Sequence, residues 1–473
     1  MTNYGTIESL PQRFDHNVDG QTLASQIANL SSRKDDIISQ IPTIDDDVRL
    51  TLRQLGEPIT YFGEDKASRR ERLIDLVTKN EIIREKFTQA LSPYTGSDMD
   101  EEELEEDEEF YTPGSEELLQ ARVDITGSSL VRARDRLTRM RSLARVDELT
   151  VLQARRQINE RLKKLDLYGT QVISNRYTSM VRVSRLTGKI AAGSWDGQTY
   201  ILDQETLGTE RILKGHDEKV GGIDWHPTSN TLITSGSEGN INFYDLESSS
   251  EKELYPVYSF TGHQGRVCRV EFHPSGNYFA SASFDMTWRY WDLVKQQQLY
   301  YQEGHSKEVF AVSHNPDGSL LASAGMDAIC RIWDLRSGKS IMVLEGHAKG
   351  IYALDWHRGN GFELLTGGAD SSIKVWDIRS STREKTTVAA HKNLVSDIRF
   401  SNDNDVIPGG AFPSRGTYFA TSSYDGTIGV FSADNWLKVK SLKVSNEKVM
   451  SCDIIGDKVI SGGWDKSVKL WAV

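Results

Sequence analysis

The chain has 473 residues, of which 38% are hydrophobic, and a formal net charge of −12. This length predicts two or three domains, and the composition allows one large core with polar extensions. Ten acidic residues and no basic residue lie at 98–109 (DMDEEELEEDEE), so the acidity is local. Such a block repels itself and is typical of a disordered spacer, although it also suits binding to a basic partner.

Cysteine usage and hydropathy exclude several classes of protein. Cys268, Cys330 and Cys452 are far apart, lie in strand-like runs and lack zinc-ligand spacing, so we expect no metal site and a reducing compartment. The N-terminal residues lack the apolar centre of a secretory signal, and no apolar run approaches 18 residues. We therefore expect no cofactor and no membrane partner.

The leader predicts short amphipathic helices. Residues 1–44 form an extension with one such helix at 22–41, and residues 45–92 form a helical unit. In that unit Gly56 ends one helix, the loop 55–64 (LGEPITYFGE) follows, and Ser68 and Glu71 have capping-box spacing before the next helix. The core of this unit is too small for independence, so we expect it to dock on a partner.

An acidic disordered linker is predicted at 93–127 and one Arg-rich helix at 128–167. Between 131 and 164 there are eleven Lys/Arg and four Asp/Glu, an unusual charge for one helix. An apolar residue recurs every seven positions from Leu130, through Leu137, to Leu165, so we expect this stripe to lie on protein. The arginines then face RNA phosphates, unless they form only a solvated face. The candidate RNA-facing residues are Arg132, Arg134, Arg136, Arg139, Arg141, Arg145, Arg155 and Arg156.

A repeat occupies residues 168–473. The clearest unit, at 304–335, begins with Gly-His and ends near Trp-Asp, which is the WD-repeat signature. One acidic turn residue marks each unit, at intervals of 42, 47, 42, 43, 55 and 40 residues: Asp196, Glu238, Asp285, Asp327, Asp370, Asp425 and Asp465. Seven units predict a mainly β fold, a seven-bladed propeller preceded by an α-helical region. A strand near 169–174 is expected to complete the last blade and close the ring.

Histidine, hydroxyl, aspartate and tryptophan recur at fixed positions in several units. The complete sets are His263, Ser281, Asp285, Trp291; His305, Ser323, Asp327, Trp333; and His347, Thr366, Asp370, Trp376. A Ser-His-Asp trio suggests nucleophilic catalysis, but a catalytic trio belongs to one site and these sets repeat. We predict a structural hydrogen-bonded chain in each blade and no catalytic residue. Blades that lack a member, such as blade one with Ala192 and blade seven with Ser445, are expected to be weaker.

A partner surface is predicted on the top rim, where the residue before each turn acid lies. The candidate residues are Trp195, Phe284, Tyr424 and Trp464, with Lys219, Arg266 and Lys448 from the neighbouring loops. Aromatic residues dominate interface hot spots. Rings among cations suit single-stranded RNA by stacking, and suit an acidic, aromatic-poor peptide equally well. The long insertion at 401–416 in blade six is either functional or neutral.

One segment of the leader carries a family resemblance. Residues 45–76 (DDDVRLTLRQLGEPITYFGEDKASRRERLIDL) resemble the splicing-factor motif that precedes the WD repeats in the WD-repeat protein family of the U4/U6 small nuclear ribonucleoprotein. The particle-binding motif residues carried over are Leu55, Gly56, Glu57, Pro58, Ile59, Phe62, Gly63, Arg69, Arg70 and Arg72.

The resemblance implies a nuclear, non-enzymatic scaffold of the U4/U6 particle and the U4/U6.U5 tri-snRNP, needed for spliceosome assembly and pre-mRNA splicing. The implied partners are U4/U6 snRNA, bound directly or through proteins, a second U4/U6 particle protein, other tri-snRNP proteins and, in some members, a cyclophilin.

WD repeats define a fold and not a function, so the repeats alone also fit three other classes of protein. A signalling adaptor of the G-protein β type does not explain the long leader with its motif. A ubiquitin-ligase substrate receptor needs a ligase-docking motif, which the sequence lacks. An enzyme is disfavoured, since no P-loop, metal-ligand set or single polar pocket is visible.

Overall fold

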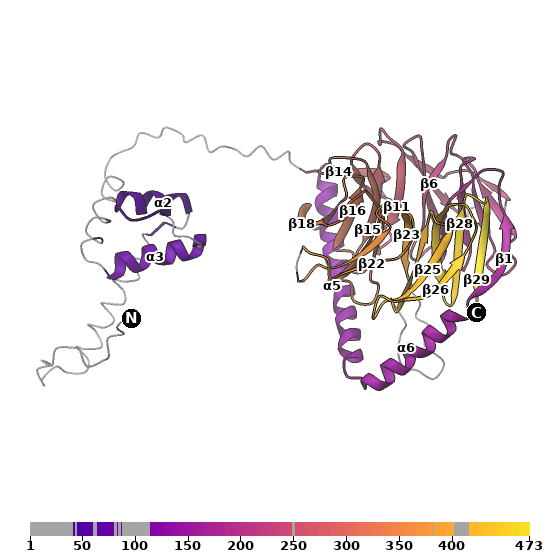
Figure 1. The fold of residues 1–473 in the computed structure, drawn as a ribbon. Coiled ribbons are helices and arrows are strands. Elements are labelled where there is room, and N and C mark those ends of the chain that lie inside the picture. Colours follow the sequence, from indigo (N-terminus) through magenta and orange to yellow (C-terminus); the bar gives the residue numbers. More distant parts are fainter. Residues whose placement is uncertain are drawn as a thin grey trace, which may run out of the picture. The chain divides into compact units, whose positions relative to one another are not determined.

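The computed structural model describes residues 41–42, 45–59, 64–79, 83, 87, 114–247, 251–380, 382–401 and 416–473. The chain divides into two compact units, Met1–Tyr111 and Thr112–Val473, which are drawn in Figure 1. Most of the helix expected at 22–41, the acidic run at 98–109 and most of the blade-six insertion lie outside the described residues.

The described residues of the first unit include two helices, α2 (Asp45–Gln54) and α3 (Lys66–Lys79). Buried apolar residues of these helices and of the segments beside them form one small core: Ile41, Val48, Leu52, Leu55, Leu73, Val77 and Phe87. The helix α2 ends at a left-handed glycine, Gly56, with φ of +78°. There Gly56 N–H donates to Arg53 O at 3.2 Å and Glu57 N–H to Leu52 O at 3.0 Å, which is a Schellman motif.

The capping box predicted at Ser68 is wrong. The helix α3 begins at Lys66, and Arg69 N–H already donates to Asp65 O at 3.0 Å. Because that bond closes the first turn upstream of Ser68, this serine lies inside the helix.

The second unit is a seven-bladed propeller with helices before it, which confirms the predicted fold class. The first strands of blades one to seven are β2 (Thr178–Val183), β6 (Val220–Trp225), β11 (Val267–Phe272), β15 (Val309–His314), β19 (Ile351–Trp356), β23 (Val395–Phe400) and β27 (Val449–Ile455). The second strands are β3 (Ile190–Ser194), β7 (Thr231–Gly236), β12 (Tyr278–Ser283), β16 (Leu320–Gly325), β20 (Glu363–Gly368), β24 (Tyr418–Ser423) and β28 (Lys458–Gly463).

The third and outer strands complete each antiparallel blade. The third strands are β4 (Thr199–Leu202), β8 (Ile241–Asp245), β13 (Trp288–Asp292), β17 (Ile329–Asp334), β21 (Ser372–Asp377), β25 (Thr427–Ser432) and β29 (Ser467–Ala472). The outer strands are β5 (Thr209–Leu213), β10 (Tyr258–Phe260), β14 (Gln297–Gln302), β18 (Lys339–Glu345), β22 (Thr386–Ala389), β26 (Lys438–Lys443) and, for blade seven, β1 (Asp166–Val172). A short strand, β9 (Glu253–Leu254), pairs in parallel with β5.

Blade seven is built from both ends of the unit. Its outer strand β1 pairs antiparallel with β29, from Asp166 opposite Ala472 to Val172 opposite Ser467. The ring is therefore closed by hydrogen bonds between segments that are far apart in sequence, and the edge of β29 is covered.

Acidic residues on the first strands link neighbouring blades. Asp224 accepts a hydrogen bond from Phe272 N–H at 2.7 Å, and Asp355 accepts one from Phe400 N–H at 2.8 Å. Asp453 of blade seven accepts one from Val183 N–H of blade one at 2.8 Å. Each bond joins one blade to the next, the last of them across the closure.

The segment before β1 corrects two predicted boundaries. The linker expected at 93–127 overlaps the helix α5 (Glu116–Leu143), which begins where the Ser115 hydroxyl caps Leu118 N–H at 3.2 Å. The single helix expected at 128–167 is two helices, because a second one, α6 (Glu148–Lys163), starts after Asp147.

The break between α5 and α6 follows from what each helix covers. Leu118, Ala121 and Ile125 of α5 pack with residues of blades three and four. Leu162, together with Leu165 just after α6, packs instead with residues of blades six and seven. One straight helix cannot reach both places, so α5 runs beyond the propeller and α6 returns to it beside β1 and β29 (Figure 1). We call residues 134–156 the elbow.

In the ranges that the structure describes, no helix is long and apolar enough to cross a bilayer. The same residues contain no group of three or more His, Cys, Asp or Glu side chains able to hold a metal ion. The three cysteines are free and buried.

Candidate partner surfaces

Each repeated set of polar side chains forms one continuous series of hydrogen bonds within its own blade. In blade three, His263 Nδ1 lies 2.7 Å from Asp285 Oδ2, and its Nε2 lies 2.7 Å from Ser281 Oγ. Trp291 Nε1–H donates to the same hydroxyl oxygen at 2.8 Å. In blade four, the His–acid, His–hydroxyl and Trp–hydroxyl distances are 2.8, 2.7 and 2.8 Å; the residues are His305, Asp327, Ser323 and Trp333. In blade five, the same three distances are 2.9, 2.6 and 2.9 Å; the residues are His347, Asp370, Thr366 and Trp376.

Protonation and burial explain why these chains are structural. Burial lowers the pKa of His263, against the effect of Asp285, so the imidazole is neutral. Burial opposes the ionisation of Asp285, but hydrogen bonds from His263 and Thr287 hold the pKa of that carboxyl below its ordinary value. Ser281 is 0% exposed, and its hydroxyl is held by two neighbours, so no substrate reaches it. A satisfied buried chain of this kind rigidifies its blade.

The blades on either side of the closure use other side chains. Ser174 Oγ lies 2.7 Å from Ser194 Oγ in blade one, where blades two to six place a histidine before the first strand. Tyr200 O–H donates to the turn acid Asp196 at 2.8 Å in that blade. In blade seven, Lys469 Nζ donates to the turn acid Asp465 at 2.6 Å. The turn acid is therefore held in these blades too, but from the third strand.

Blades two and six keep the histidine. His216 Nδ1 lies 2.6 Å from the carboxylate of Glu238, and His391 Nδ1 lies 3.1 Å from Asp425. The indole is replaced by Tyr244 in blade two and by Phe431 in blade six.

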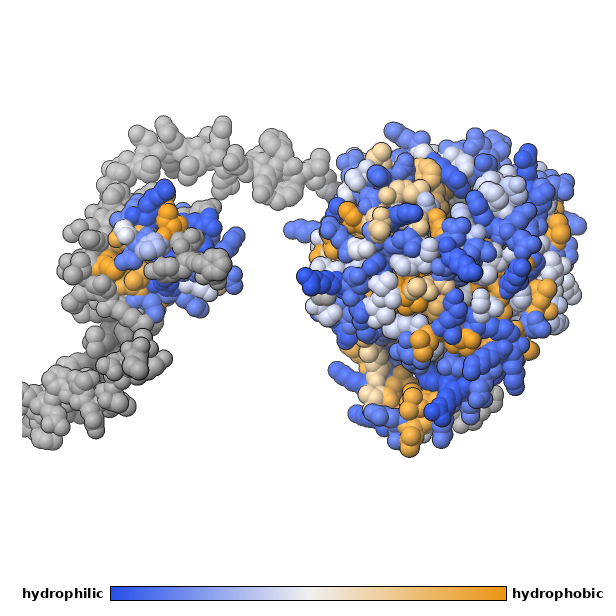
Figure 2. Space-filling view, viewed as in Figure 1, coloured by the Kyte–Doolittle hydropathy of each residue, from blue (hydrophilic) through white to orange (hydrophobic). Residues whose placement is uncertain are grey.

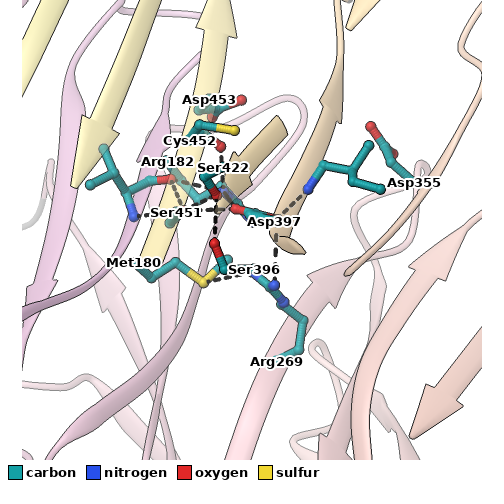
Figure 3. Close-up of polar contacts among 12 residues, drawn as sticks. Met180, Arg182, Arg269, Asp355, Ser396, Asp397, Ser422, Ser451, Cys452 and Asp453 are labelled. Carbon is teal, nitrogen blue, oxygen red and sulfur yellow. Dashed lines mark hydrogen bonds and ion pairs between the residues drawn. The ribbon is translucent and has the colours of Figure 1, made fainter. Parts of the chain in front are cut away.

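A buried ion pair lies between the first strands at the centre of the ring. Arg182 Nη1 of blade one donates to Asp397 Oδ2 of blade six at 2.9 Å and to Cys452 O of blade seven at 3.1 Å (Figure 3). Arg269 of blade three approaches the other oxygen of Asp397 at 3.4 Å. Burial opposes ionisation, but Arg182 and Arg269 hold the pKa of Asp397 below its ordinary value. The beginning and end of the propeller are thereby joined at its axis.

The top rim gathers aromatic rings and lysines at the closure. Tyr177 stacks on Trp464 with 4.7 Å between ring centroids, and Trp195 meets both rings edge-on at 5.4 and 5.9 Å. Lys448 Nζ lies 4.2 Å from the Trp464 ring centroid and 4.9 Å from that of Tyr424. Lys219 Nζ lies 4.4 Å from the Trp195 centroid. We call Tyr177, Trp195, Lys219, Tyr424, Lys448 and Trp464 the closure cluster. The other two predicted rim residues, Arg266 and Phe284, pair with each other at 5.9 Å.

Sequence reasoning missed a second set of rim residues. Each first strand has an irregular register near its start, and the residue there is Phe310 in blade four, Tyr352 in blade five and Met450 in blade seven. Bulges re-aim side chains, and these three line the top mouth of the channel. Tyr177 was also missed. Phe310, Tyr352 and Met450 follow the histidine position of their repeats at the same interval, so aligning the repeats there would have found them.

The arginines of α5 and α6 divide into two groups. Arg136 binds Asp317 with both ends of its guanidinium, the closest pair at 2.6 Å, and donates to Asn360 O at 2.7 Å. Arg132 donates to Pro274 O at 2.9 Å, and Arg155 lies 3.3 Å from Asp434. These three side chains face the propeller, which corrects the expectation that they face RNA. The exposed candidates are Arg134, Arg139, Arg141, Arg145 and Arg156.

The predicted apolar stripe of this segment is also corrected. Leu130 is 60% exposed and Leu137 is 44% exposed, although Leu165 is buried. Exposed leucines lie next to the arginines of the elbow, where Figure 2 shows apolar surface: Leu137, Leu143, Leu149 and Leu152.

The arginines of the splicing-factor motif point inward in the first unit. Arg69 is 4% exposed and is hydrogen-bonded to Asp45. Arg72 binds Glu64 at 2.6 Å and donates to Ile59 O at 3.3 Å. Arg70 donates to Pro42 O at 3.3 Å. These bonds fasten the segments before α2 and after the loop to α3. Of the other motif residues, Leu55 is buried, whereas Phe62 and Gly63 lie outside the described residues.

Comparison with known proteins agrees with this architecture. The family model for pre-mRNA processing factor 4 (PRP4) like proteins matches residues 48–76. The model for the WD domain, G-beta repeat, matches residues 208–245, 254–292, 296–334, 338–377, 409–432 and 436–472.

Individual relatives point the same way. The U4/U6 small nuclear ribonucleoprotein PRP4 of Saccharomyces cerevisiae is 41% identical over 480 residues, covering 100% of both chains. An uncharacterized WD repeat-containing protein of Schizosaccharomyces pombe is 39% identical over 52% of both chains. The human U4/U6 small nuclear ribonucleoprotein Prp4 is 33% identical over 44% of this chain and 40% of its own.

The fold and the two matching family models define a WD-repeat propeller that carries an N-terminal splicing-factor motif. Within that class, the chain belongs to the family of the U4/U6 small nuclear ribonucleoprotein PRP4. The resemblance predicted from residues 45–76 is thereby confirmed.

Proposed function

We propose that the protein is a non-enzymatic scaffold of the U4/U6 small nuclear ribonucleoprotein and of the U4/U6.U5 tri-snRNP, acting in the nucleus in spliceosome assembly and pre-mRNA splicing. The observation that carries this proposal is the full-length similarity to a U4/U6 particle protein, which includes both the leader motif and the propeller. A signalling adaptor or a ligase receptor would not share the leader.

The elbow is the surface that we assign to RNA and to a second particle protein. Its exposed arginines, including Arg141 and Arg145, are available to phosphates, and the exposed leucines beside them suit a protein. U4/U6 snRNA is therefore bound directly at the elbow, with the second protein packed next to it.

The closure cluster is assigned to an acidic segment of a particle protein. Lys448 and Lys219 cover faces of Trp464, Tyr424 and Trp195, and Tyr177 covers another face of Trp464. Base stacking needs a free ring face, so this arrangement disfavours RNA. The two ammonium groups, held in place by the rings, favour carboxylates. A cyclophilin is the further partner that the family suggests, and no surface described here is assigned to it.

The proposed function is tested by purifying the tagged full-length protein from cell extract and sequencing the RNA that co-purifies. U4 and U6 snRNA are expected to be enriched together, with U5 snRNA when the tri-snRNP is intact. Absence of both U4 and U6 would reject the scaffold function and leave only the fold.

The closure cluster is tested by reversing its charge with Lys219→Glu and Lys448→Glu together. Quantitative mass spectrometry of the purified particle should show at least about a tenfold loss of one protein, with U4/U6 snRNA retained, since two charged contacts are reversed. Lys392→Glu, an exposed lysine in the matching loop of blade six, is the control. Loss of RNA with unchanged proteins would favour single-stranded RNA as the ligand and overturn this assignment.

A further inference from the structure

A polar cavity lies at the lower end of the propeller channel, where the first strands end, and α5 forms one of its walls. Its volume is about 570 Å³, within the range of small-molecule sites. The strands begin at the rim that carries the closure cluster, so the cavity opens on the opposite face. The polar chains of the blades do not use it, and Arg139 is the one exposed RNA-facing candidate of the elbow that lines it.

Arginine dominates the lining of this cavity. Seven arginines and five acids contribute: Arg132, Arg136, Arg139, Arg182, Arg185, Arg358 and Arg399, with Asp135, Asp224, Glu271, Asp317 and Asp453. The excess of positive charge comes from separate elements, α5, the loops after β2 and β19, and the strand β23. Such convergence is a feature of binding sites and is not needed to hold α5 in place.

Most of the acids in the lining are already bound. Asp317 forms a bidentate ion pair with Arg136, in which Arg136 Nη2 lies 2.6 Å from Asp317 Oδ2. Asp224 accepts from Phe272 N–H, and Asp453 accepts from Val183 N–H and Ile454 N–H. Glu271 is 3.8 Å from Arg358. These carboxylates are fixed by the fold. Burial opposes the charge of Arg399, but Asp397 and Asp355 hold its pKa above the ordinary value, and Arg358 Nη2 donates to Asp355 at 2.7 Å. What the lining leaves without a partner is therefore single guanidinium nitrogens.

Several arginine donors in the lining have no acceptor. Among the described buried polar atoms without a hydrogen-bond partner are four nitrogens of this lining: Arg132 Nη1, Arg182 Nε, Arg358 Nε and Arg399 Nε. Arg182 and Arg399 are 3% and 9% exposed, so their donors are nine-tenths buried. Burial also lowers the pKa of Arg132, although Asp317 opposes this, so its charge is incompletely compensated. Buried donors without acceptors are costly, and an anion would satisfy them.

We propose that this cavity binds a phosphate-bearing anion, which α5 holds against the lower mouth of the channel. The phosphate belongs either to a free polyphosphorylated small molecule or to an RNA backbone, since both present the same oxygens to guanidinium groups. Arg132 and Arg139 supply contacts from α5, and Arg358 and Arg399 supply them from the propeller. The bound anion would link the leader helix to the channel.

The test is isothermal titration calorimetry of inorganic tripolyphosphate into the full-length protein. We expect saturable binding with one site, weakened about tenfold by Arg139→Gln and at least as much by Arg132→Gln, because each loses a charge-assisted hydrogen bond. Arg139 is exposed, so its variant folds normally even if Arg132→Gln loosens α5. Lys163→Gln, an exposed residue at the end of α6 that lies outside both the lining and the elbow, should bind as the parent does.

Two results would overturn the site. One is the absence of saturable heat with the parent protein. The other is an equal loss of affinity in Lys163→Gln, which would indicate non-specific attraction to the basic helices. A competing single-stranded RNA oligonucleotide separates the two sources of phosphate. Displacement of tripolyphosphate by the oligonucleotide assigns the cavity to RNA, and failure of displacement assigns it to a free phosphorylated molecule.

Discussion

Two regions of this protein are rich in arginine, and they use it in opposite ways. In the α2–α3 unit, Arg69, Arg70 and Arg72 bind carboxylates and carbonyls of their own unit. At the elbow between α5 and α6, Arg141 and Arg145 are exposed. Both regions look similarly basic in the sequence, but Arg141 and Arg145 are exposed to solvent, whereas Arg69 is buried.

The comparison shows that a family motif can be structural even when its residues look like binding residues. The α2–α3 unit has a small core, so a few ion pairs decide whether it folds. In the elbow, Arg136 and Arg155 pair with carboxylates of the propeller, whereas Arg141 and Arg145 are exposed.

The largest effect is expected from Arg69→Met. It leaves Asp45 and the largely buried Glu64 without this cation, which costs about 3–5 kcal/mol for a buried pair. Hydrogen exchange should show loss of protection in α2 and α3, while the propeller strands keep theirs. Arg53→Met, an exposed residue of α2, is the control. Unchanged protection would mean that the motif arginine is not structural.

Arg136→Met should have the next largest effect. The variant leaves Asp317, which is 5% exposed, without its two-pronged partner, at a cost of about 2–3 kcal/mol. Because Leu118, Ala121 and Ile125 still hold the first half of α5, only its second half should exchange faster. Arg134→Met, with a side chain 79% exposed, should change nothing. If both variants behave alike, Arg136 is not an anchor and belongs with the RNA-facing group.

A smaller effect is expected from the double variant Arg141→Glu and Arg145→Glu. RNA affinity, measured by fluorescence anisotropy, should fall about tenfold or more, and the salt dependence should lose about 0.7 per phosphate contact removed. The free energy of unfolding should change by less than about 0.5 kcal/mol, since both residues are exposed. Equal affinities of variant and parent would remove the contrast between the two regions.

The smallest effect is expected from Arg70→Gln. This side chain is half-buried and makes one hydrogen bond, to Pro42 O at 3.3 Å. Its loss should lower the stability of the α2–α3 unit by about 0.5–1.5 kcal/mol in urea unfolding followed by hydrogen exchange. A loss as large as that of Arg69→Met would show that Arg70 has further contacts in the folded unit.

The propeller could be predicted because the sequence repeats the same residue pattern at nearly constant intervals. Turn acids recur at nearly constant intervals, and a histidine, a hydroxyl and an indole keep their places around them. The substitutes in the closure blades were harder to anticipate, because Tyr200 and Lys469 hold the turn acid from another strand. Rim residues such as Phe310 depend on a local irregularity in register, which alternation of side chains does not predict.

The leader was less predictable, for a physical reason. The buried face of α5 is continued by Arg132 and Arg136 after Leu118, Ala121, Ile125 and Ser129, at intervals of three and four residues. The apolar periodicity ends at the positions where arginine replaces an apolar residue. The aliphatic part of an arginine side chain can nevertheless cover apolar surface while its guanidinium group pairs with a carboxylate. The seven-residue repeat through Leu130 and Leu137 was therefore mistaken for the contact face.

The most direct test of the account is ultraviolet crosslinking of the protein to RNA in cell extract, with sequencing of the RNA and mapping of the crosslinked peptides. We predict U4 and U6 snRNA, with crosslinks at the elbow, residues 134–156, and none in α3, residues 66–79. Crosslinks confined to α3, or U4/U6 snRNA that co-purifies without any crosslink at the elbow, would contradict the proposed division between structural and RNA-facing arginines.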